Sequence, residues 1–183
     1  MDVDFLVLLE NSIGRTKFIY LYISAGLGAA ALQIIFSYWG YLSAYEAYME
    51  LGYTKTQVME ALQFTQDTGK IRYQPIPLET AQQLADNYLT PMVGASGAIF
   101  GVLAAFALLY PNLPLYFIFV PIPIKAKYLI GGYFLINVYS AISGDTLLGP
   151  SNTAYWAHIG GAIVGFIMMW IWKKDMNNFN RWN

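Results

Sequence analysis

The sequence contains no cysteine, a single histidine and few charged residues. The absence of cysteine excludes disulfides, thiol catalysis and cysteine-based metal sites. One histidine with scattered carboxylates gives no ligand set for a zinc ion, and no metal or other cofactor is expected. Charged residues make up 11% of the 183 residues, under half of the ~25% typical of soluble domains. The net charge of −1, without a basic patch interleaved with aromatic residues, gives no case for a nucleic-acid partner.

The sequence contains long apolar runs, and these runs predict membrane-spanning helices. About 20 apolar residues are enough to cross the ~30 Å hydrocarbon layer of a bilayer. The many tyrosine and tryptophan residues suit the two interfaces of that bilayer. We therefore expect an all-α fold, a polytopic bundle of transmembrane helices that forms one domain over residues 1–183. Four complete spans are predicted, at residues 18–42, 92–110, 126–143 and 154–172.

The segment at residues 43–90 is more polar than the spans and is predicted to be an extra-cytoplasmic loop with short helices. The apolar spacing within it favours helices at residues 54–64 and 77–88, the first of them capped by Thr54. Residues 113–124 are apolar but contain three prolines. Because proline breaks a helix, this stretch is predicted to be a connector at the membrane interface.

The basic residues predict the orientation of the spans. Four spans alternate sides, and the basic residues on one side are Arg15, Lys17, Lys125, Lys127, Lys173, Lys174 and Arg181. The other side has three, all in the loop at residues 43–90. Because cytoplasmic loops carry an excess of Lys and Arg, both ends of the chain are predicted to be cytoplasmic. The expected location is the plasma (inner) membrane, as a multi-pass integral protein.

An apolar pentapeptide, Phe5 to Leu9, lies close to the first methionine. It is too short to span a bilayer, and it lacks the positive region that precedes the apolar core of a signal peptide. We interpret it as the cytoplasmic end of a partial N-terminal span whose first part is missing.

Ser96 and His158 are the two side chains in the predicted spans with the most useful chemistry. Ser96 lies in the sequence GASGAIFG at residues 94–101, and His158 lies in AHIGGAIVG at residues 157–165. Each lies about four residues into a span that runs from the outside inward, which is roughly 6 Å below the start of its helix. A candidate nucleophile and a candidate base are therefore expected at one depth on one side of the membrane.

The residues around His158 and Ser96 suit close packing of helices. His158 shares its helix face with Gly161 and Gly165, a pair of small residues that lets another helix approach closely. The glycines beside Ser96 leave room for a substrate backbone, and they let the Ser96 amide point at a developing oxyanion. Phe100 follows Ser96 by one turn, where its ring is expected beneath an imidazole bonded to the serine.

Simpler interpretations of the same residues stay open. A glycine-rich stretch with one serine is usually a packing interface, and a serine hydroxyl often bonds a carbonyl of its own helix. His158 could be a structural hydrogen bonder or part of a proton relay. A transporter or relay would need further ionisable groups deep within the spans, but the spans contain no Asp, Glu or Arg, and their one lysine, Lys127, lies at a span end. Asn137 and Gln33 are interpreted as interhelical hydrogen bonders without a chemical role.

The two motifs together resemble those of the rhomboid intramembrane serine proteases. By this resemblance Ser96 is the nucleophile and His158 the general base of a dyad in a serine-type endopeptidase, and its partners are transmembrane protein substrates within the bilayer. The other positions that match the family are Gly94 and Gly97 beside the serine, Phe100 beneath the histidine, and Gly161 and Gly165 at the helix contact.

The N-terminal part of the sequence departs from the family pattern. The family has six spans, and its second span carries a histidine and an asparagine that help to bind the oxyanion. Here the sequence resembles a rhomboid that begins part-way through the second span. Such a chain is expected to be weak or inactive. The alternative function is that of a catalytically inactive rhomboid-like protein or fragment that binds transmembrane segments.

Overall fold

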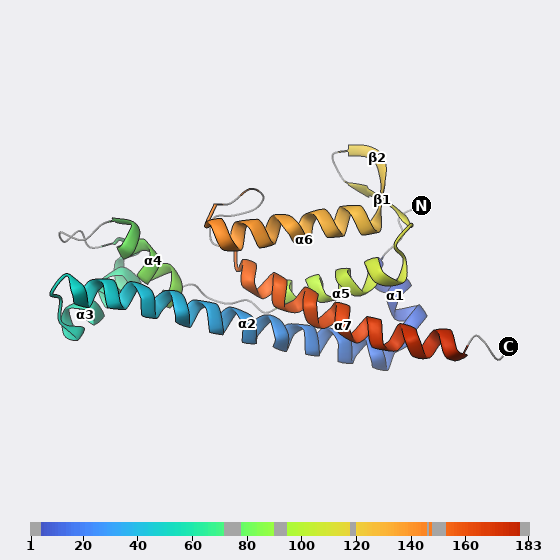
Figure 1. Cartoon of the computed structure of the whole chain (residues 1–183), viewed down its shortest axis with the longest axis horizontal. Coiled ribbons are helices and arrows are strands. Elements are labelled where there is room, and N and C mark those ends of the chain that lie inside the picture. Colours follow the sequence, from blue (N-terminus) through green and yellow to red (C-terminus); the bar gives the residue numbers. More distant parts are fainter. Residues whose placement is uncertain are drawn as a thin grey trace. The chain divides into compact units, whose positions relative to one another are not determined.

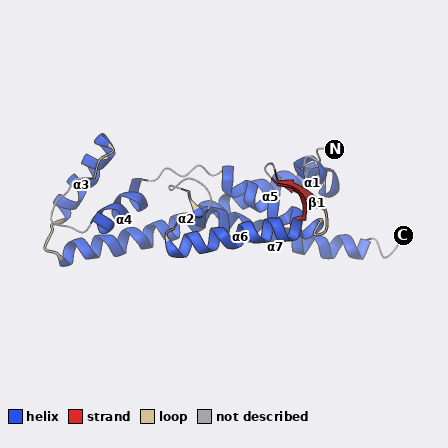
Figure 2. Ribbon diagram, turned by 90° about the horizontal axis from the view of Figure 1, so that it is seen from above, coloured by secondary structure: helices blue, strands red, loops and turns tan. Residues whose placement is uncertain are grey.

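The computed structural model describes residues 5–71, 78–89, 95–117, 120–145, 147 and 153–179. Most of these residues are helical, so the predicted all-α class is confirmed, and the described part also contains one small sheet (Figure 2). The chain divides into two compact units, one made of Met1–Gln33 with Val93–Asn183 and the other of Ile34–Met92.

A single residue, Gly14, separates helix α1 (Phe5–Ile13) from helix α2 (Arg15–Glu50). Its φ of +82° suits glycine, because residues with a side chain rarely adopt this conformation. Helix α2 continues past Leu42, so the prediction that a loop begins at residue 43 is wrong. The residues that follow include two alanines, two glutamates and one methionine, which favour helix, and the helix therefore continues after the composition becomes more polar.

The unit at Ile34–Met92 contains the last turns of α2 with helices α3 (Lys55–Thr68) and α4 (Leu78–Leu89). Thr54 caps α3 as predicted. Its backbone N–H donates to Gln57 Oε1 at 2.8 Å, and its side chain accepts from the Gln57 N–H, which forms a capping box. The core of this unit consists of Ala44, Tyr48, Val58, Leu62, Ala81 and Leu84. The two short helices predicted in this region are therefore confirmed.

The other unit combines the first part of α2 with helices α5 (Ala95–Leu109), α6 (Ala126–Ser143) and α7 (Tyr155–Phe179), and the last three pack against one another (Figure 1). Helix α7 continues past residue 172, where the fourth span was predicted to end. The buried residues of α5 are Gly97, Ala98, Phe100, Gly101, Val102, Ala105 and Phe106. The hydrophobic core of this unit includes a cluster of buried side chains from five elements. Its members are Leu9, Ile13, Leu21, Val102, Ala105, Phe106, Ala126 and Met169.

Contacts between small residues show the relative direction of the neighbouring helices. Gly161 and Gly165 of α7 meet Gly97 and Gly101 of α5 in the same order, so these two helices are parallel. Two alanines of α2 meet the same glycines of α5 in the reverse order, so α2 is antiparallel to both helices. Small residues permit this spacing because no side chain separates the backbones. These directions are those expected of alternating spans.

Strands β1 (Pro114–Phe117) and β2 (Val120–Lys125) form an antiparallel hairpin between α5 and α6. Each strand has one unpaired edge, where a proline does not interrupt the ladder of hydrogen bonds. The prediction that this proline-rich stretch is not a helix is confirmed, whereas its pairing into a hairpin was not predicted.

Two described helices are long and apolar enough to cross a bilayer, Arg15–Glu50 and Tyr155–Lys174. The apolar helix Ala95–Leu109 is shorter, and the first residues of the second predicted span, 92–94, lie outside the described residues. The four complete spans and the partial N-terminal one therefore stay a prediction.

Candidate functional site

Helices α5 and α7 touch through their backbones beside the two residues singled out in the sequence. A Cβ atom on Gly97 would lie 3.0 Å from the carbonyl oxygen of Ala157, and one on Gly161 would overlap the carbonyl oxygen of Gly97. Ser96 directly precedes Gly97, and His158 directly follows Ala157. The serine and the histidine therefore lie at one level of this helix pair.

Aromatic rings fix the plane of the His158 imidazole. The Phe100 ring is stacked on it, with 4.0 Å between the ring centroids and 9° between the planes. Tyr155 meets it edge-on at 6.4 Å, and Tyr133 of α6 lies 5.1 Å from the Phe100 ring. The expected contact between Phe100 and the imidazole is thus present. His158 is only 6% exposed, so its imidazole is buried among its neighbours.

Ser96 lies in the first turn of α5 and is exposed, whereas Gly97 and Ala98 after it are buried. The first N–H groups of a helix have no acceptor within the helix, and they form the positive end of its dipole. The serine is therefore at a helix end where a developing negative charge is favoured. Gly94, the first glycine of the motif, lies outside the described residues.

Asn137 of α6 bonds directly to the imidazole. Its Oδ1 lies 2.7 Å from Nδ1 of His158, and its Nδ2 donates to the carbonyl oxygen of Tyr133 at 2.8 Å. The prediction of an interhelical hydrogen bond is confirmed, but its partner was not predicted. One signal pointed to that partner: a polar side chain in an apolar span needs a partner, and His158 is the histidine of the spans.

Gln33 of α2 makes the second interhelical hydrogen bond predicted from the sequence. Its Oε1 accepts from the backbone N–H of Ala157 at 3.1 Å. This N–H is in the first turn of α7, and it also donates to the backbone carbonyl oxygen of Ala154 at 3.0 Å. The bond therefore holds the start of α7, and with it the backbone next to His158, against α2.

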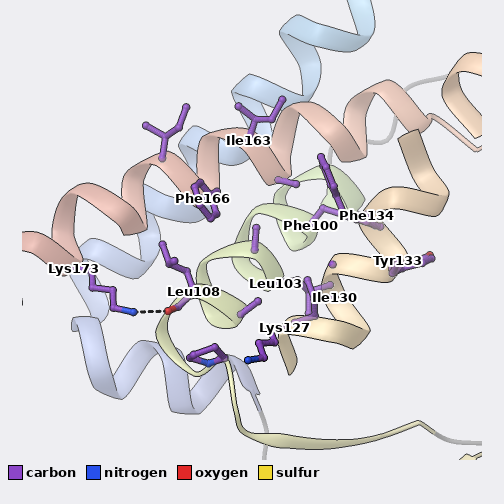
Figure 3. A pocket seen from close by; sticks show the side chains of 16 residues that line it. Phe100, Leu103, Leu108, Lys127, Ile130, Tyr133, Phe134, Ile163, Phe166 and Lys173 are labelled. Carbon is purple, nitrogen blue, oxygen red and sulfur yellow. Dashed lines mark hydrogen bonds between the residues drawn. The ribbon is translucent and has the colours of Figure 1, made fainter. Parts of the chain in front are cut away.

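An apolar cavity of about 600 Å³ lies between α5, α6 and α7 (Figure 3). Phe100 and Tyr133 line it at one end, and Lys127 and Lys173 line it at the other. The ammonium group of Lys173 donates to the carbonyl oxygen of Leu108 at 2.8 Å, which is the dashed line in Figure 3. The cavity thus adjoins the stacking partner of the imidazole and is apolar along most of its length.

The groups gathered at this level are a hydroxyl, an imidazole, a buried amide and the N-terminus of a helix. In acyl transfer a hydroxyl attacks a carbonyl, a neighbouring base takes the hydroxyl proton, and N–H groups stabilise the oxyanion. The arrangement therefore contains the residue types that acyl transfer requires. Among the described residues, no group of three or more His, Cys, Asp or Glu side chains could hold a metal ion.

A family model of the Rhomboid domain matches residues 75–175, more than half of the chain. The matched region begins before α4 and extends into α7, so it includes Ser96, Asn137 and His158.

A segment of 87 residues is 36% identical to Rhomboid protein 1, mitochondrial, of Saccharomyces cerevisiae. This segment covers 46% of the chain and 23% of the yeast protein, so the chain spans less than a quarter of the length of that relative. The name of the relative gives a mitochondrial location, which lends no support to the predicted plasma membrane. No solved structure matches the chain.

Proposed function

Because the chain belongs to the rhomboid family, we propose that it is a serine-type intramembrane endopeptidase, with Ser96 as the nucleophile and His158 as the general base. One observation supports this proposal most directly. Phe100 stacks on the His158 ring and follows Ser96 by one helical turn, so a single turn of α5 carries both the hydroxyl and the support of the imidazole.

The proposed reaction is the hydrolysis of a peptide bond through an acyl-enzyme. The imidazole of His158 takes the proton from the Ser96 hydroxyl while the oxygen attacks the scissile carbonyl. The imidazolium then gives that proton to the leaving amine as the peptide C–N bond breaks. Water, activated by the same imidazole, attacks the acyl ester, releases the new carboxyl end of the substrate and regenerates the serine.

Backbone groups at the start of α5 are the proposed oxyanion site. The amide of Ser96 belongs to the first turn of the helix, whose N–H groups favour negative charge. Gly94 and Gly97 flank it and would let the substrate backbone approach closely. Gly161 and Gly165 would support the site from α7, because their lack of a side chain permits the contact with α5.

The proposed substrates are transmembrane protein segments. The chain is an integral membrane protein, with apolar helices long enough to cross a bilayer. The apolar cavity that begins at Phe100 would accept the side chains of a membrane-embedded segment more readily than those of a polar peptide. Because an intact helix conceals its carbonyl groups, segments that unwind near the outer face of the membrane would be cleaved best.

The proposed topology has four spans with both chain ends in the cytoplasm, and single cysteines test it because the chain has none of its own. A membrane-impermeant maleimide should label Asp67→Cys, in the loop predicted outside, in intact cells. It should label Lys174→Cys only after the membrane is permeabilised. Both side chains are exposed, so access to the reagent depends on the membrane alone. The opposite labelling pattern would contradict the proposed orientation.

A fluorophosphonate probe tests the proposed nucleophile and base in the purified chain. Labelling is a single-turnover reaction, so it requires an activated serine but no natural substrate. We expect one labelled serine in the wild type, and loss of the label in both Ser96→Ala and His158→Ala. Ser140→Ala is a matched control, because it removes a buried hydroxyl that has no hydrogen-bond partner within the described structure. This variant should label like the wild type.

Labelling that persists in Ser96→Ala would contradict the proposed nucleophile. A wild-type chain that is folded but does not react would support the alternative, a rhomboid-like protein that binds transmembrane segments without cleaving them.

A further inference from the structure

The hydrogen bonds of Asn137 fix which way its side-chain amide points. The amide is 2% exposed, and its Nδ2 donates to the Tyr133 carbonyl oxygen at 2.8 Å. In the reversed orientation two oxygens would face each other, and the donation to Tyr133 would be lost. The oxygen of the amide therefore faces His158, at 2.7 Å from Nδ1.

This orientation determines the tautomer of the imidazole. An amide oxygen accepts hydrogen bonds and cannot donate them, so Nδ1 must carry the proton of their shared hydrogen bond. A neutral imidazole has one proton between its two nitrogens, which leaves Nε2 with a free lone pair. Nε2 is then the atom of His158 that can accept a proton from a hydroxyl.

We propose that Asn137 is a positioning residue, which holds His158 in the Nδ1-protonated tautomer and directs Nε2 toward Ser96; the inference rests on the proposed protease function. The Phe100 stack fixes the plane of the ring, but a stacked ring can still turn within that plane or flip. The hydrogen bond from Nδ1 removes this freedom, because only one edge of the ring can reach Asn137. Serine, histidine and asparagine would then act as a unit.

An amide suits this role better than a carboxylate at this position. Soluble serine proteases use an aspartate to orient their catalytic histidine. Within an apolar helix bundle, however, a carboxylate has a high desolvation cost. The amide supplies the same acceptor without a charge. One N–H of its nitrogen donates to the Tyr133 carbonyl oxygen of its own helix, so its nitrogen and its oxygen both make a hydrogen bond.

The single histidine of the chain makes the tautomer directly observable by nitrogen NMR. In the chain labelled with ¹⁵N-histidine, every imidazole signal comes from His158. We expect the wild type to show a protonated, pyrrole-type Nδ1 and a pyridine-type Nε2 at a pH where the ring is neutral. Asn137→Leu, which keeps the branched shape of the side chain but has no acceptor, should shift the population toward the Nε2-protonated form. A wild-type spectrum with a pyridine-type Nδ1 would overturn the inference.

The rate of fluorophosphonate labelling then separates positioning from packing. Removing a side chain that orients a metal-binding histidine typically costs about 10- to 100-fold in activity, and we expect a similar factor for His158. We expect Asn137→Leu to slow labelling by this factor without weakening the initial binding of the probe, while Ser140→Ala, one turn further along α6, keeps the wild-type rate and spectrum. Equal rates in Asn137→Leu and the wild type would overturn the inference and leave the protease proposal intact. The expected tautomer in a chain that never reacts would instead contradict the protease proposal alone.

Discussion

Replacing Ser96 with alanine is expected to lower cleavage of a membrane-embedded reporter by at least about 10³-fold, since loss of the nucleophile in a soluble serine protease costs about 10⁶ in kcat. Replacing His158 with alanine is expected to have a similar effect. Without the base the hydroxyl stays protonated and is a weak nucleophile. The reporter is a single transmembrane helix with glycine and proline near its outer end, reconstituted in vesicles with the protein, and cleavage is measured by the appearance of its fragments.

The double variant gives the sharper test. If Ser96 and His158 act as a unit, removing both should cost little more than removing one. Ser140→Ala is again the control for loss of a hydroxyl. Additive losses in the double variant, or cleavage by Ser96→Ala above one-tenth of the wild-type rate, would show that the two residues do not form one catalytic pair.

The sequence predicted that Ser96 and His158 lie at the same depth along their helices, because their positions depend on regular helical spacing. Small residues recur every four positions in α5 and α7, and such a pattern permits the close approach of two backbones. The contacts of Gly97 with Ala157 and of Gly161 with Gly97 follow from this pattern. The Thr54 cap was predictable for a similar reason, because its capping box depends on a residue three positions further along the chain.

Two contacts between distant segments lack such a repeat and were not predicted. The bond between Asn137 and His158 joins α6 to α7, and nothing local to either residue identifies its partner. The hairpin required the pairing of β1 with β2, whereas its prolines indicated only that a helix was excluded. The end of α2 was misplaced for another reason: a fall in hydropathy marks where a helix leaves an apolar environment, and the helix itself can continue.

Replacing Gly161 with alanine is expected to destabilise the helix pair by about 1–3 kcal/mol, the usual cost of forcing a methyl group into a packed core. Its Cβ would overlap the carbonyl oxygen of Gly97, a backbone atom that cannot rotate away. Helices α5 and α7 must therefore move apart. Because a shift of about 1 Å between reacting groups can cost about 10²-fold in rate, fluorophosphonate labelling of Ser96 should slow by a similar factor. Thermal unfolding in detergent measures the first effect, and the labelling rate measures the second.

Gly132→Ala provides the matched control for this substitution. It makes the same chemical change inside an apolar helix, but a Cβ at Gly132 would have no neighbour within 4 Å. Since alanine is favoured over glycine in a helix by about 0.5–1 kcal/mol, this variant should be as stable as the wild type or slightly more stable. A Gly161→Ala chain that unfolds at a lower temperature but labels at the wild-type rate would separate packing from catalysis. That result would show that the close contact of α5 and α7 stabilises the bundle without setting the distance between Ser96 and His158.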